Sequence, residues 1–170
     1  MNKIIDQTFK VAIYLRLSKE DDDLSCSSGA KSESNSISNQ RKLIYDFMKL
    51  HPELELYDEY KDDGKSGSNF DRAEFQRMMK DIEAGKVNCV VVKDQSRFGR
   101  DYIDVGKYKE KIFPKLGVRF ITINEGYDSL SATSSDDLAF TINSFVYDFY
   151  IRDISTKIRT NLTAKKQNGE

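Results

Sequence analysis

The chain has 170 residues, of which 32% are charged, and its formal net charge at pH 7 is -1. This length suits one domain with a substantial core, while the absence of any apolar run long enough to span a bilayer disfavours an integral membrane protein. Two cysteines and one histidine offer little for a disulfide framework, a zinc site or histidine-based catalysis. The composition therefore predicts a reduced, cytoplasmic protein.

Apolar segments with strand character alternate with segments of helical periodicity. Strands are predicted at 10–18, 53–60, 88–93 and 118–124, and helices at 36–50, 71–84 and 101–116. The second of these helices has a capping-box-like start in Asp71 and Glu74, and Gly85 ends it. This order predicts one α/β domain in three layers, with a central, mainly parallel sheet of four to five strands and right-handed crossovers.

From about residue 135 the pattern changes to a single long helix. Apolar residues recur every three to five positions without a proline: Leu138, Ile142, Phe145, Phe149, Ile154, Ile158 and Leu162. A helix of this length exceeds what a small sheet can cover, so part of it is expected to pack on another molecule, most simply a second copy. We therefore divide the chain into a domain at 1–133 and an oligomerisation helix at 134–170.

Positive charge is unevenly distributed along the chain. Residues 86–119 contain nine basic and four acidic side chains, and residues 150–166 contain five basic and one acidic. A charge run is usually only a solvated face, but this asymmetry is compatible with a polyanion on one side.

Three segments with polar side chains are expected at the carboxyl edge of the sheet, where parallel sheets carry their sites. Arg16 and Ser18 are two residues apart at the end of the first strand and should share a face with Tyr14. The other two segments are the 61–72 loop and the turn with Arg97 and Arg100. Guanidinium groups hold phosphate oxygens through paired hydrogen bonds, so this cluster predicts an anion site beside a serine hydroxyl.

Each feature has a simpler interpretation. A serine at the end of a strand is ordinarily a turn residue, and a lone arginine usually forms a surface salt bridge. The "GKSG" segment lacks the spacing of a nucleotide-binding phosphate loop, which argues against nucleotide hydrolysis. A non-catalytic oligomerisation or DNA-binding module and a small phosphate-ester hydrolase both remain alternatives.

Four segments together resemble the catalytic domain of the serine recombinases, the resolvase/invertase family. They are "YLRLS", "SISNQR", "DDGKSGSNFDR" and "SRFGRD". The "LSKEDDD" segment and the long loop after Ser18 are more similar to the large recombinases of conjugative transposons and phages than to small resolvases. The resemblance implies a resolvase-like fold and a site-specific recombinase that excises or integrates mobile DNA.

The resemblance also implies a role for each matching residue. Ser18 would attack a DNA phosphodiester, form a 5′-phosphoserine bond and release a 3′-hydroxyl, with no ATP, metal or other cofactor. Three arginines would hold the scissile phosphate, namely Arg16, Arg97 and Arg100. Five residues would support them: Tyr14, Gln40, Asp63, Ser66 and Arg72.

Partners follow from the same resemblance: double-stranded DNA, a homodimer that forms a synaptic tetramer, and a directionality factor. The expected location is the cytoplasm, at the nucleoid. Two positions depart from the small resolvases. Ser96 replaces an aspartate before the first arginine of the turn, and Tyr150-Ile151 replaces a Glu-Arg pair in the long helix. The DNA-binding part expected after the helix is not in this sequence, which suggests an amino-terminal fragment.

Overall fold

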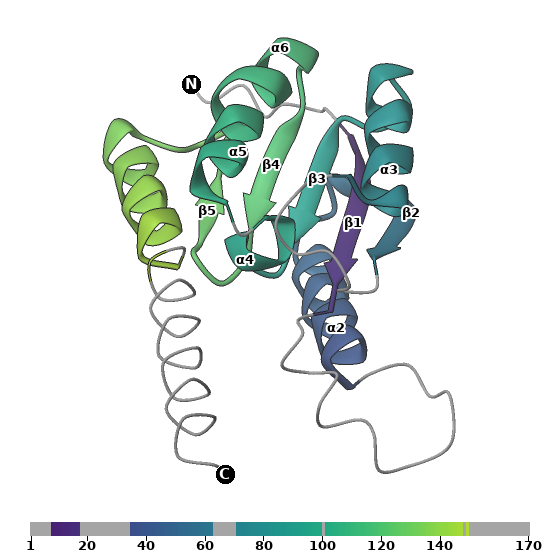
Figure 1. Ribbon diagram of the computed structural model, residues 1–170. Coiled ribbons are helices and arrows are strands. Elements are labelled where there is room, and N and C mark those ends of the chain that lie inside the picture. The colour runs from purple at the N-terminus through teal and green to yellow at the C-terminus, as the bar shows by residue number, and fades with distance from the viewer. Residues whose placement is uncertain (1–7, 18–34, 63–70, 100, 148, 150–170) are drawn as a thin grey trace, which may run out of the picture.

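A computed structural model describes residues 8–17, 35–62, 71–99, 101–147 and 149 of the chain. Its strands and helices alternate in the predicted order (Figure 1). The strands are β1 (Phe9–Arg16), β2 (Leu54–Asp62), β3 (Cys89–Val92), β4 (Arg119–Thr122) and β5 (Tyr127–Asp128). The helices are α2 (Asn35–Lys49), α3 (Ala73–Glu83), α4 (Gln95–Phe98), α5 (Tyr102–Lys107), the π-helical turn η1 (Tyr108–Ile112) and α6 (Phe113–Leu116). A further helix, at 134–147, lies at the left of Figure 1.

The sheet has the order β2-β1-β3-β4-β5, and every pairing except the antiparallel β4–β5 is parallel. The chain passes from β1 outward to β2 and then crosses back to β3 on the other side of β1. In open parallel sheets, sites form at a switch point of this kind, which here lies beyond the carboxyl ends of β1 and β3. The predicted fold class is confirmed, with β5 as a short fifth strand.

Alternate residues of β1 enter two separate cores because a strand points successive side chains to opposite faces. Val11, Ile13 and Leu15 pack with Ile37 and other residues of α2. On the opposite face, Ala12 and Tyr14 join a larger core rich in aromatic rings, formed with α3, η1, α6 and the 134–147 helix. Three layers result, and Arg16 continues the row of Ala12 and Tyr14 at the carboxyl edge.

Two local predictions were wrong in detail. Arg72 rather than Asp71 occupies the N-cap of α3 and makes no side-chain cap hydrogen bond, so the capping box does not form. The helix predicted over 101–116 is divided by the π turn η1, in which Lys109 is buried. Gly117 ends this run as expected, in the left-handed conformation with φ 67°.

The 134–147 helix packs on the domain only along part of its surface. Phe140 and Ser144 are buried, whereas Leu138, Ile142, Phe145 and Phe149 are each more than half exposed. An exposed apolar stripe of this kind is typical of a surface that contacts another protein. The predicted continuation of the helix through Ile154, Ile158 and Leu162 lies outside the described residues.

Candidate active site at the carboxyl ends of β1 and β3

Arg16 and Arg97 meet at the switch point although 81 positions separate them. The Arg16 side chain, on a residue only 1% exposed, donates from Nε to the carbonyl of Arg97 at 3.0 Å and from a terminal nitrogen to the carbonyl of Ser96. In return, Arg97 Nη1 donates to the carbonyl of Arg16 at 3.5 Å. These bonds place the two predicted phosphate-binding arginines side by side, with α4 as their shared support.

Gln40 reaches from α2 to the last residue of β1 and binds its backbone in both directions. Its Oε1 accepts from the Arg16 amide at 3.4 Å, and its Nε2 donates to the Arg16 carbonyl at 3.2 Å. The residue is 1% exposed, so no water competes for these groups. Gln40 therefore orients the backbone that leads to Ser18, which lies outside the described residues.

Asp62, the last residue of β2, joins Tyr14 and the start of α3. Its carboxylate accepts from the Tyr14 hydroxyl at 2.8 Å and from the backbone amides of Glu74 and Phe75 at 3.2 and 3.0 Å. A carboxylate at a helix N-terminus satisfies amides that have no partner within the helix and interacts favourably with the helix dipole. Asp62 thus performs the capping role that the sequence suggested for Asp71.

Arg72 completes this network and connects it to α4. Its Nη1 donates to the Tyr14 hydroxyl at 2.7 Å and to the Phe98 carbonyl at 3.1 Å. The Tyr14 hydroxyl therefore receives one hydrogen bond and donates another. Burial raises the pKa of Tyr14, and the charge of Arg72 only partly offsets this effect, so the hydroxyl stays protonated as this arrangement requires.

Two carboxylates hold the backbone of α4 on the side of β4. Asp94 caps α4, accepting from the Arg97 amide at 3.1 Å and from the Ser96 hydroxyl at 2.6 Å. Glu125 accepts from the Gln95 amide at 3.2 Å. Burial raises the pKa of Glu125, and the nearby Asp94 charge raises it further. The turn that carries Arg97 is thus anchored by acidic groups near its amino end.

The structure brings five predicted site residues together: Tyr14, Arg16, Gln40, Arg72 and Arg97. The other four, Ser18, Asp63, Ser66 and Arg100, lie outside the described residues. Sequence reasoning missed Asp62, Asp94 and Gln95. Asp62 ends β2 and Asp94 lies two residues after β3, so a carboxylate at the carboxyl end of a strand is the signal that could have identified both.

The described residues contain no group of three or more His, Cys, Asp or Glu side chains arranged to hold a metal ion. Within the same part of the chain, no helix is both long and apolar enough to cross a membrane. Cys89 is fully buried, and burial raises the pKa of its thiol to about 12, so it stays protonated at neutral pH.

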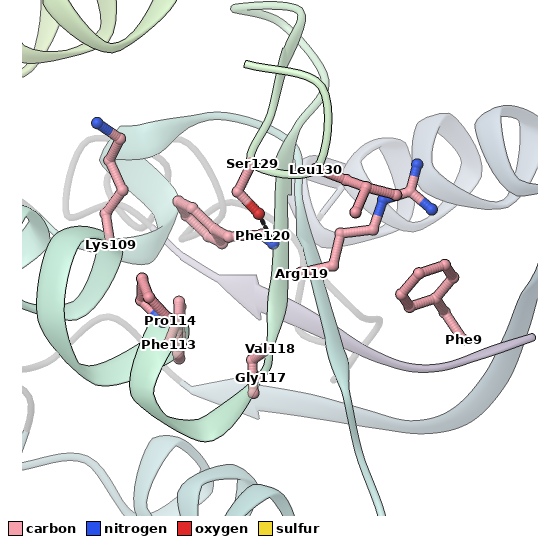
Figure 2. A pocket seen from close by; sticks show the side chains of 10 residues that line it. All are labelled: Phe9, Lys109, Phe113, Pro114, Gly117, Val118, Arg119, Phe120, Ser129 and Leu130. Carbon is pink, nitrogen blue, oxygen red and sulfur yellow. Dashed lines mark hydrogen bonds between the residues drawn. The ribbon is translucent and has the colours of Figure 1, made fainter. Parts of the chain in front are cut away.

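A pocket of about 310 Å³ lies at the opposite end of the strands (Figure 2). Phe9 at the start of β1 and Arg119 at the start of β4 line it, together with Phe113, Phe120 and Leu130. Arg119 is engaged by Asp128 at 2.7 Å and Glu53 at 3.5 Å. The pocket is therefore separate from the arginine cluster, which lies where these strands end.

Comparison with known proteins agrees with this α/β fold. The model of the resolvase N-terminal domain matches residues 11–170, so the chain belongs to the resolvase family of serine recombinases. No match was found among curated proteins.

Solved structures of serine recombinases are also similar. The N-terminal catalytic domain of TP901-1 integrase has 27% sequence identity and a TM-score of 0.62, covering 84% of this chain and 97% of that domain. A resolvase family site-specific recombinase from Streptococcus pneumoniae has 27% identity and a TM-score of 0.57, covering 94% and 99%. The catalytic domain of ISC1926 TnpA, an IS607-like serine recombinase, shares the fold at 20% identity and a TM-score of 0.54, covering 95% and 99%.

Proposed function

We propose that this chain is the catalytic domain of a site-specific recombinase that cleaves and rejoins double-stranded DNA through a 5′-phosphoserine bond at Ser18. The observation that carries the proposal is the buried pairing of Arg16 with the Arg97 turn. It places two guanidinium-bearing residues at the end of the strand from which Ser18 follows two positions later. Membership of the resolvase family supports the same chemistry.

In the proposed reaction the Ser18 oxygen attacks the phosphorus while the bond from phosphorus to the 3′ oxygen breaks. The serine loses a proton, the departing 3′ oxygen gains one, and the 5′ phosphate remains esterified to the protein. Because one phosphodiester replaces another, the reverse attack by a 3′-hydroxyl reseals the strand without ATP or another cofactor. Arg16, Arg97 and Arg100 stabilise the negative charge that develops on the non-bridging oxygens.

The supporting residues hold the backbone and the neighbouring elements of this arginine cluster in place. Gln40 fixes the backbone of Arg16, and Tyr14 and Arg72 connect β1 to the end of α4. Asp63 is the next residue after Asp62, which anchors the network, and Ser66 is four positions after Asp62. We assign them to the DNA side of the site on the family motif alone.

The 134–170 segment is proposed to carry the contacts of a homodimer and of the tetramer that pairs two DNA sites. Its exposed apolar side chains, including Leu138, Ile142 and Phe149, support this role because water-facing residues of this size are unfavourable in a monomer. Excision or integration of a mobile element is the biological role that we propose, with a directionality factor as a further partner.

The test detects the covalent bond between the protein and DNA, and it does not require the target sequence to be known in advance. The natural protein is incubated with genomic DNA from its host and quenched in denaturant. One portion is digested with nuclease and protease, and mass spectrometry should find a nucleotide on the peptide that contains Ser18. A second portion is digested with protease alone, and sequencing of the attached DNA identifies the cleavage site. Ser18→Ala should abolish the adduct while DNA binding persists, and the exposed Ser131→Ala should leave it unchanged.

Each other outcome excludes the proposal in a recognisable way. DNA binding without an adduct from the natural protein would favour the non-catalytic module. Release of inorganic phosphate from small phosphate esters would favour a hydrolase. An adduct that persists in Ser18→Ala would reject Ser18 as the nucleophile.

A further inference from the structure

Gln95, the first residue of α4, directs its side chain away from the arginine cluster and toward the 134–147 helix. Its Nε2 donates to the carbonyl of Phe140 at 3.2 Å, and its Oε1 accepts a hydrogen bond from the hydroxyl of Ser144. The Ser144 hydroxyl also bonds the Phe140 carbonyl at 3.0 Å. One amide thus makes two bonds to one turn of the helix that carries the exposed apolar stripe.

These bonds are buried, and the space beside them is at most about the size of one water molecule. Gln95 is 1% exposed and Ser144 is 8% exposed. The space between α4, α5 and the helix, lined by Gln95, Ser96, Ser144 and Tyr147 among others, is only about 10 Å³. A water molecule needs at least about this volume and two or more polar partners. If the helix moved, the Gln95 amide would either follow it or lose its partners, and an unsatisfied buried amide is costly.

The same turn supports the arginines directly. The carbonyls of Ser96 and Arg97, the two residues after Gln95, accept the hydrogen bonds of Arg16. The Gln95 carbonyl also accepts from the Gly99 amide at 3.0 Å, which closes the turn. A displacement at Gln95 therefore reaches the supports of both Arg16 and Arg97 within two residues.

We propose that Gln95 is a positioning residue that couples the arginine site to the 134–147 helix. This inference rests on the proposed function, since it concerns how the phosphate-binding arginines are held. Through Gln95, the 134–147 helix holds α4 in place, and the backbone carbonyls of α4 in turn hold Arg16.

Gln95→Met is the informative variant because methionine is similarly long and unbranched but forms neither bond. Ser144 retains the Phe140 carbonyl as its acceptor, so the variant leaves no buried polar group without a partner. The assay measures adduct formation by the natural protein on two duplexes that contain the cleavage site recovered from its covalent adduct. One duplex has a normal scissile phosphodiester. The other has a methylphosphonate there, in which a neutral methyl group replaces a charged oxygen.

We expect Gln95→Met to reduce the adduct rate about tenfold on the phosphodiester and less than twofold on the methylphosphonate. The difference arises because arginine positions matter most where there is charge to stabilise. Ser144→Ala should show the same selectivity at about threefold, since Gln95 retains its bond to Phe140. Thr141→Ala is the matched control, because it removes from the same helix an exposed hydroxyl that donates to the Asp137 carbonyl at 2.9 Å. It should leave the ratio of the two rates unchanged.

Equal losses on both duplexes for Gln95→Met and Ser144→Ala would overturn the inference, because they would indicate a general structural effect. Unchanged rates on both would overturn it as well. If Gln95→Met fails to fold, as judged by urea unfolding, the Ser144→Ala ratio decides alone. If the natural protein forms no adduct on either duplex, the proposed function itself fails and this inference fails with it.

Discussion

Replacing Asp62 by alanine tests whether this residue, rather than Asp71, caps α3 and supports Tyr14. The change removes one carboxylate that accepts three hydrogen bonds, from the Tyr14 hydroxyl and from the amides of Glu74 and Phe75. Losing a helix cap costs about 1–2 kcal/mol. Leaving the buried Tyr14 hydroxyl without its acceptor adds about 1–3 kcal/mol. Because these effects overlap, we expect a loss of about 2–4 kcal/mol in the free energy of unfolding.

Urea denaturation followed by circular dichroism measures this loss directly. With a slope of about 2 kcal/mol/M, the midpoint should fall by about 1–2 M. Asp71→Ala is the matched control: Asp71 is exposed and precedes the observed N-cap, so its replacement should change stability by less than about 0.5 kcal/mol. A cost for Asp71→Ala equal to or above that for Asp62→Ala would refute the assignment of the cap.

Three further changes test the arginine cluster and the packing of the long helix. Arg16→Lys should keep the fold but reduce DNA adduct formation at least about tenfold, because an ammonium group cannot serve two carbonyls and a phosphate as a guanidinium does. Tyr14→Phe should lower the free energy of unfolding in urea by about 1–3 kcal/mol, since it removes both bonds of a buried hydroxyl. Lys109 holds the pKa of Asp137 below its ordinary value, so this pair stabilises the protein at neutral pH and loses that effect as pH falls through the folded pKa. Asp137→Ala should therefore lower the free energy of unfolding at pH 7 by about 1–2 kcal/mol, a modest loss because Asp137 is half exposed to solvent. In urea titrations toward pH 3, the difference in this free energy between the variant and the wild type should shrink.

The alternation of strands and helices was predictable because each element carries its own periodicity. The predicted ends of four strands and three main helices lie within about two residues of the observed ends. The predicted apolar positions of α3 are the residues that form its buried face. The short β5 was missed because two residues cannot show a pattern, and its pairing with β4 depends on tertiary contact. The π turn at Tyr108–Ile112 was also missed, because the spacing of apolar residues does not distinguish it from an α-helix.

Charge counting along the chain overstated how much basic surface the 86–119 segment offers to DNA. Lys109 is buried under the rings of Tyr127 and Phe140 and pairs with Asp137 at 2.7 Å. Lys86 pairs with Asp81, and Arg119 pairs with Asp128. A sequence shows how many cations a segment has, but not which of them already have a carboxylate from elsewhere in the fold.

The convergence of the site residues was predictable for a different reason, namely the topology. In a parallel sheet the carboxyl ends of neighbouring strands share an edge, so Arg16 and Arg97 had to be near one another once their strands were assigned. The supports could not be predicted in the same way. That Gln40 binds the backbone of Arg16, or that Gln95 turns away from the site, depends on how α2 and the 134–147 helix pack.

The serine at position 96 shows how a local departure from the family pattern can be read through its contacts. Small resolvases, which this chain resembles in its motifs, have an aspartate immediately before the first arginine of the turn, and here that position is Ser96. The Ser96 hydroxyl donates to Asp94 at 2.6 Å, and the same carboxylate receives the Arg97 amide. An aspartate at 96 would place a second negative charge beside the first at a distance where two carboxylates repel strongly. The serine instead lets Asp94 both cap α4 and keep a carboxylate one hydrogen bond away from position 96. Asp94, two positions earlier in the chain, therefore supplies a carboxylate to this turn.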